Sequence, residues 1–162
     1  MLAPSGTIVL ACAVATARQA EVWRNGTALF EHAIAVTTGN HVAHNLLGLE
    51  LYDRRRFDDA AREFEAAIAA FSAMHEAHSN LGLSLAVRGR FAEAIPHYDD
   101  ALRFRADYAT AYLNLAIALA HTGDTERARD SAERARRLAV EHDDGALAAQ
   151  AVTFIRALGP ET

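Results

Sequence analysis

The chain has 162 residues, enough for one domain, and its 51% hydrophobic, 23% charged and 7% aromatic residues are typical of a globular protein. Its 37 alanines and its scarcity of valine and isoleucine favour helices over strands, so we expect an all-α fold. The net charge of −5 argues against a nucleic-acid partner, and the single cysteine, Cys12, excludes an internal disulfide and any cysteine-based metal cluster.

The chain begins with an apolar segment, residues 2–17. Its most apolar part, residues 7–17, is much shorter than the roughly 20 residues that a helix needs to cross a bilayer. No basic residue precedes Arg18, so the segment lacks the positive start of a signal peptide. Three interpretations stay open: a helix of the domain core, the stub of a membrane helix that contacts a membrane, or an assembly surface.

A period of 34 residues runs through the middle of the chain. The string LLGLEL at residues 46–51 returns as NLGLSL at residues 80–85 and as NLAIAL at residues 114–119. Self-similarity at a fixed period of this length indicates a stack of structural repeats. The sequence therefore predicts three units, at residues 41–74, 75–108 and 109–142.

Within each unit, small residues recur at one position of the first helix: Gly48, Gly82 and Ala116. We expect the two helices of a hairpin to cross closely there, since only a minimal side chain lets two backbones approach. The aromatic residues Phe64 and Tyr98 recur on the second helix, and we expect them to wedge between neighbouring units.

Glycine also marks the turns between the two helices of a unit, at Gly89 and Gly123. A helix ends most easily in a left-handed residue, which glycine adopts without strain. Asp124 follows directly and is expected to cap the next helix.

The same register extends in both directions. Residues 7–40 form a fourth, degenerate unit, in which Phe30 takes the position of Phe64. After the third unit, residues 143–158 carry apolar side chains at helical spacing, and we expect a capping helix that covers the last exposed face of the stack.

The spacing of Leu47-Gly48, Ala60, Phe64 and Ala67, with its two repetitions, resembles the tetratricopeptide repeat. The resemblance implies a right-handed superhelical stack of antiparallel helix hairpins, with residues 1–162 as a single domain. Two positions depart from the pattern. The proline that often closes a unit is replaced by Ser72, Ala106 and Val140, and the third unit has Thr125 and Ala132 where aromatic residues are expected. We therefore predict a looser third unit.

The resemblance also implies a function: a protein-interaction scaffold whose first helices line a concave groove that receives a partner protein or peptide. The groove positions carried over to this chain are Asn45, Leu49, Tyr52, Asp53, Ser79, Asn80, Leu83, Val87, Leu113, Asn114, Ile117 and His121. Leu49, Leu83 and Ile117 are equivalent and predict an apolar stripe that favours an apolar or amphipathic partner segment.

Asn80 and Asn114 are also equivalent positions. A side-chain amide can both donate to and accept from a peptide backbone, and similar asparagines hold extended peptides in the repeat arm of O-GlcNAc transferase. The alternative is that these amides bond locally within the stack, and the sequence leaves both open.

No constellation of catalytic residues and no phosphate-binding or metalloprotease motif occurs, so we expect neither an enzyme nor a cofactor. The histidines at His41 and His44 recur at His75 and His78, which repeat duplication explains without a metal site. Arginines gather at the turns, where solvation is the usual explanation of a charge run.

Two further hypotheses concern the ends of the chain. Residues 21–48 look like the junction in bacterial glycosyltransferases of the protein-mannosyltransferase-like kind, where tetratricopeptide repeats follow the membrane domain. Alternatively, an apolar first helix and a last helix with Phe154 and Ile155 would let copies associate head to tail. The partner's identity, the oligomeric state and the compartment, cytoplasmic or extracytoplasmic, do not follow from the sequence.

Overall fold

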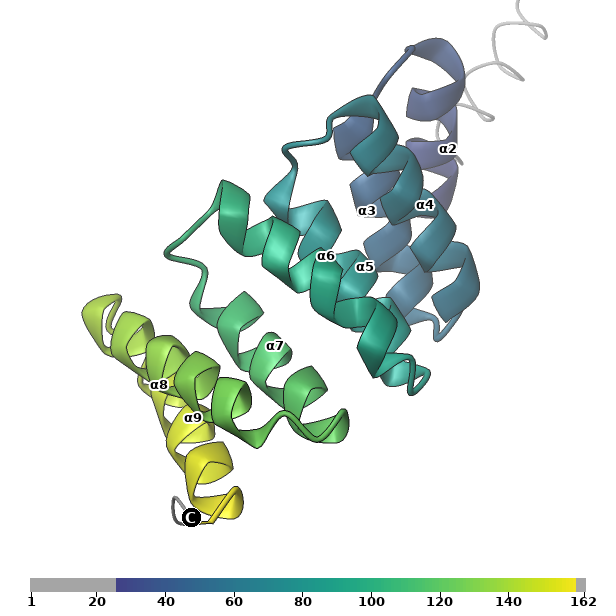
Figure 1. Ribbon diagram of the computed structural model, residues 1–162. Coiled ribbons are helices and arrows are strands. Elements are labelled where there is room, and N and C mark those ends of the chain that lie inside the picture. Colours follow the sequence, from purple (N-terminus) through teal and green to yellow (C-terminus); the bar gives the residue numbers. More distant parts are fainter. Residues whose placement is uncertain (1–25, 160–162) are drawn as a thin grey trace, which may run out of the picture.

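The computed structural model describes residues 26–159, and this part of the chain is entirely helical, which confirms the predicted all-α class (Figure 1). The hypotheses on residues 2–17 lie outside the described residues. The helices follow one another along the stack in chain order. They are α2 (Gly26–Val36), α3 (His41–Asp53), α4 (Phe57–Ala70), α5 (His75–Val87), α6 (Phe91–Phe104), α7 (Ala109–His121), α8 (Thr125–Glu141) and α9 (Gly145–Ala157).

The helices pack as consecutive antiparallel hairpins, α3 with α4, α5 with α6 and α7 with α8. Each first helix also contacts the first helix of the next pair, so that α3 touches α5, α5 touches α7 and α7 touches α9. The backbones of the second helices α4, α6 and α8, all within the described part of the chain, do not approach one another in this way. The first helices therefore form the inner layer of a curved stack and the second helices form its outer layer.

Each hairpin closes with three residues between its helices, and the middle residue is left-handed. Gly89 and Gly123 have φ of 76° and 88°, which confirms their predicted place at the turns. In the first hairpin the equivalent residue is Arg55, with φ of 60°. A side chain in this conformation costs roughly 1–2 kcal/mol relative to glycine, so the first hairpin carries strain that the other two lack.

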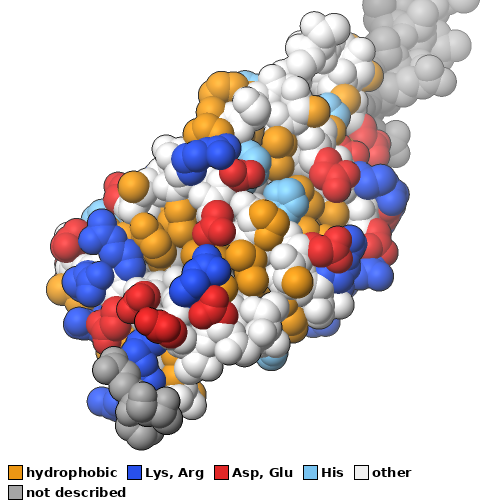
Figure 2. Space-filling model, viewed as in Figure 1, with side chains coloured by type: hydrophobic (Ala, Val, Ile, Leu, Met, Phe, Trp, Pro, Cys, Tyr) orange, Lys and Arg blue, Asp and Glu red, His pale blue; other side chains and the backbone are white. Residues whose placement is uncertain are grey.

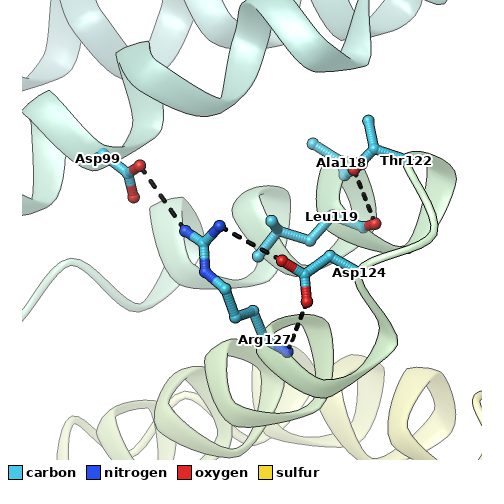
Figure 3. Close-up of polar contacts among 6 residues, drawn as sticks. All are labelled: Asp99, Ala118, Leu119, Thr122, Asp124 and Arg127. Carbon is cyan, nitrogen blue, oxygen red and sulfur yellow. Dashed lines mark hydrogen bonds and ion pairs between the residues drawn. The ribbon is translucent and has the colours of Figure 1, made fainter.

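The turn before α8 shows how a helix begins in this stack (Figure 3). The Asp124 carboxylate accepts a hydrogen bond from the backbone N–H of Arg127 at 3.2 Å, as its sequence position predicts. The same bond type recurs where Asn40 caps α3 and Asp144 caps α9. The Arg127 side chain turns back to lie 3.4 Å from Asp124, and it reaches Asp99 of α6 at 3.9 Å. One arginine thus spans two neighbouring hairpins.

The core corrects one expectation about the small residues. A Cβ added at Gly48 would lie 2.5 Å from the ring of Phe64, which is fully buried. The ring of the second helix therefore fills the space above the glycine of its own hairpin. The glycine accommodates an aromatic ring and not a backbone, and Phe64 packs within the hairpin instead of wedging only between units.

The third hairpin corrects a second expectation. At the positions of Gly48 and Phe64 it has Ala116 and Ala132, and both side chains are fully buried. One added methyl on α7 is matched by the loss of a ring on α8, and α7 packs against α8 as extensively as α3 against α4. The third unit is therefore not looser than the others.

Helix α9 packs against the last hairpin, α7 with α8. Ala151 is buried against Leu113 and Ala135, and Phe154 and Leu147 pack on the same cluster. Between residues 26 and 159, none of the helices combines the length and apolarity that crossing a bilayer demands.

Candidate peptide-binding surface

The groove residues predicted from the tetratricopeptide resemblance all lie on the first helices α3, α5 and α7. They differ in how far their side chains are buried. Asn45, Ser79 and Leu113 occupy one equivalent position, and their exposed fractions are 6%, 3% and 6%. We expected them to project from the inner layer. They are instead buried, and two of them meet the next first helix: Asn45 meets Asn80 of α5, and Leu113 meets Ala151 of α9.

The other members of the predicted set remain accessible to different degrees. Leu49, Asp53, Val87 and His121 are exposed. Tyr52, Asn80, Leu83, Asn114 and Ile117 are partly buried. A binding role for these residues stays a prediction.

The two asparagines differ in their hydrogen bonds. Asn80 donates from its amide nitrogen to the side-chain oxygen of Asn45 at 3.1 Å, which joins α5 to α3. Because Asn45 is buried, this bond satisfies a polar group that water cannot reach. For Asn80 the local interpretation therefore holds, whereas no hydrogen bond among residues 26–159 engages the side chain of Asn114.

Helix α3 also exposes two apolar side chains that the predicted groove positions do not include. Val42 and Leu46 are 49% and 37% exposed, and Leu49 is 38% exposed. Their spacing of four and then three residues places them on one side of α3, and we name them the α3 apolar stripe. The helical spacing of these three residues is visible in the sequence, but the groove positions predicted from the resemblance omit Val42 and Leu46.

Two ring contacts lie beside the first helices. His121 at the end of α7 stacks on Phe91 at the start of α6, with ring centroids 3.9 Å apart and planes 2° from parallel. Tyr52 meets Phe57 edge-on, with centroids 5.1 Å apart. These contacts orient the rings at the turn end of the inner layer.

Six arginines at the turns are paired with carboxylates of their own region. Arg54 lies 2.7 Å from Glu50, Arg56 lies 2.6 Å from Asp59, and Arg88 pairs with Asp58. The same holds further along the stack, where Arg90 pairs with Glu93, Arg103 with Asp100 and Arg105 with Asp107. Figure 2 shows acidic and basic side chains interspersed on one face of the molecule. A local ion-paired surface therefore explains these arginines without an acidic partner.

The family model described as Tetratricopeptide repeat matches residues 45–109 and 89–139, which together span more than half of the chain. The chain belongs to the tetratricopeptide repeat family. The 34-residue period and the helix hairpins described above agree with this family. No curated protein matches this tetratricopeptide repeat protein.

Solved structures with the same fold include PcrH from Pseudomonas aeruginosa, with a TM-score of 0.71, 21% identity, and coverage of 77% of this chain and 96% of that one. PcrH in complex with the chaperone binding region of PopD has a TM-score of 0.67 and 24% identity, covering 69% and 85%. The yeast Sti1 TPR2B domain, in a complex with pHsp70, has a TM-score of 0.70 and 20% identity, covering 73% and 94%. At these identities the likeness establishes the fold.

Proposed function

We propose that this tetratricopeptide repeat protein binds a segment of a partner protein on its inner layer, through apolar side chains of the first helices. The observation that carries the proposal is the α3 apolar stripe. Its three residues are each more than a third exposed on a helix of the inner layer, although leucine and valine gain most when buried. Val87 of α5, the first helix of the next hairpin, is also 49% exposed.

The relatives support a binding role. PcrH is solved with the chaperone binding region of PopD, and the Sti1 domain is solved with pHsp70, so this fold accommodates segments of other proteins. Apolar recognition suits this chain better than charge recognition, because six of the arginines at its turns are already paired with its own carboxylates. The partner segment is therefore apolar or amphipathic, and the proposed role is binding without catalysis.

The proposal also includes the organisation of the surface. We infer that residues 41–74, 75–108 and 109–142 are three units of one domain and that residues 143–158 close it. The starts of α3, α5 and α7 at His41, His75 and Ala109, each 34 residues apart, support this division. A degenerate unit over residues 7–40 remains a proposal, of which the structure describes α2.

The test replaces the apolar stripe by charge. The double variant Leu46→Glu/Leu49→Glu puts two carboxylates on the inner layer, and Val140→Glu is the control, since Val140 is 63% exposed on the outer helix α8. Each protein, immobilised, is exposed to a lysate of the source organism, and the retained proteins are quantified.

We expect partners that the wild type and Val140→Glu retain to fall about tenfold or more with the double variant, since charging a central apolar contact removes much of the binding energy. Circular dichroism checks that all three proteins remain helical. Equal retention by the double variant and the control would contradict the proposal.

Of the alternatives from the chain ends, self-association alone has a counterpart among the similar structures, one of which is described as an alternative dimer of SycD from Yersinia enterocolitica. The comparisons supply nothing in favour of a glycosyltransferase repeat region, and the proposed contact of residues 2–17 with a membrane lies outside the described residues. Head-to-tail association through α9 would need free apolar side chains, but Phe154 packs on Leu113 and Ile155 is partly buried.

A further inference from the structure

Two histidines face each other inside the second hairpin. His78 of α5 is 7% exposed at its side chain, and His97 of α6 is partly buried, with ring centroids 6.2 Å apart. The Nδ1 atoms of both rings are buried and lack a hydrogen-bond partner. Because buried polar atoms are nearly always satisfied, two such atoms side by side need an explanation.

The equivalent position in the first hairpin shows what is missing. There, His44 and Glu63 stand 34 residues before His78 and His97, and His44 Nδ1 lies 2.8 Å from the Glu63 carboxylate. In the first hairpin, His44 Nδ1 therefore faces a carboxylate, which accepts hydrogen bonds. In the second hairpin the equivalent histidine, His78, faces another imidazole, that of His97.

The tautomer of His78 is fixed by its other nitrogen. Nε2 lies 3.0 Å from the backbone carbonyl of Ser72, and a carbonyl only accepts, so Nε2 carries the proton. Nδ1 therefore presents a lone pair. A histidine that donates one N–H to a backbone carbonyl and turns its other nitrogen inward has the arrangement typical of metal ligands.

A carboxylate completes the cluster. Asp100, one turn after His97 on α6, places an oxygen 3.8 Å from His78 Nδ1, beyond hydrogen-bonding distance. One ligand atom from each of His78, His97 and Asp100 lies within 4.8 Å of the other two. Ligands of a tetrahedral Zn²⁺ stand roughly 3.3 Å apart, so a modest rotation of these side chains brings the three atoms into range.

We propose that His78, His97 and Asp100 bind a divalent transition metal of the Zn²⁺ class, which joins α5 to α6. Two imidazole nitrogens and one carboxylate oxygen are a donor set suited to Zn²⁺, and water supplies the fourth position. Burial, and then the neighbouring His78, lowers the pKa of His97 below its usual value. Glu65 and Glu93 add negative charge around His97. Arg103, 3.0 Å from Asp100 Oδ1, opposes the cation but leaves Oδ2, the oxygen that faces His78 Nδ1, to the metal.

The test measures Zn²⁺ binding to the untagged full chain, stripped with chelator, by isothermal titration calorimetry and by thermal unfolding. His97→Ala removes one ligand, and Asp100→Asn removes another on a more exposed side chain, so at least one variant stays folded for measurement. His44→Ala is the matched control, because it removes the equivalent histidine of the first hairpin.

We expect one Zn²⁺ per wild-type chain and per His44→Ala chain, with a raised unfolding temperature for both. Affinity falls about a hundredfold in His97→Ala and about tenfold or more in Asp100→Asn. Equal binding by all four proteins would mean scattered association with surface histidines and would overturn the site. Absence of binding to the wild type at micromolar Zn²⁺ would overturn it equally.

Discussion

The ring of Tyr98 lies directly against Gly82, so that a Cβ added to this glycine would stand 2.7 Å from the Tyr98 ring. Tyr98 is fully buried and has no room to withdraw. Gly82→Ala should therefore lower the free energy of unfolding by about 1–3 kcal/mol, as overpacking in a dense core does. Urea denaturation measures the change. Gly145→Ala serves as the control, since its added methyl meets nothing within 4 Å, and an equal loss there would contradict the explanation.

The left-handed Arg55 gives a prediction of opposite sign. Arg55→Gly should raise the free energy of unfolding by about 0.5–1 kcal/mol, because relief of the left-handed strain exceeds the entropy that glycine gains in the unfolded chain. Gly89→Ala, at the equivalent turn of the second hairpin, should cost about 1 kcal/mol, since its φ is 76° and the added Cβ has free space. Thermal unfolding of both variants checks the pair. A lower free energy of unfolding for Arg55→Gly would show that the interactions of the arginine side chain outweigh the strain of its left-handed backbone.

The two asparagines of the inner layer should respond differently to truncation. Asn80→Ala leaves the buried Asn45 amide without its partner and should cost about 1–2 kcal/mol. Asn114→Ala should stay within about 0.5 kcal/mol of the wild type, since no such bond is lost. Chemical denaturation of both variants, and of Asn45→Ala/Asn80→Ala, measures the coupling between the pair. Additive losses in the double variant would refute the bond's contribution.

The cap of α8 can be separated from its ion pairs. Asp124→Ala removes the acceptor for the Arg127 N–H and should lower stability by about 1 kcal/mol. Asp124→Ser keeps an oxygen at that position while removing the charge, so it should retain most of the stability. Comparison of the two by urea denaturation distinguishes the contributions. If Asp124→Ser lost as much as Asp124→Ala, the half-exposed ion pair with Arg127 would carry the effect instead.

Sequence was sufficient for the local structure of the stack. The period set the starts of the hairpins, and Gly89, Gly123 and Asp124 identified turns and a cap, because each depends on the conformation of a few neighbouring residues. The contact between Gly48 and Phe64 was harder to predict from the sequence. A small residue shows that something approaches closely, but not whether a backbone or a ring does so.

The candidate surface depended on how hairpins pack against one another, which a repeat period does not specify. Burial of Asn45 and Leu113 follows from contact with the next first helix, so it required the curvature of the stack. The sequence period relates histidines that lie 34 residues apart along the chain. The structure pairs them across the hairpin, 19 residues apart in His44–Glu63, and places His78 opposite His97 in the same way.

The backbones of the outer helices α4, α6 and α8 approach only the helices that precede and follow them in the stack. Each hairpin is thus held by the two beside it, and a terminal hairpin by one. Amide hydrogen exchange should consequently be slowest in α5 and α6 and faster toward α9, as cooperative units at an end open without disturbing the middle. The molecule would then lose its order progressively from an end, hairpin by hairpin.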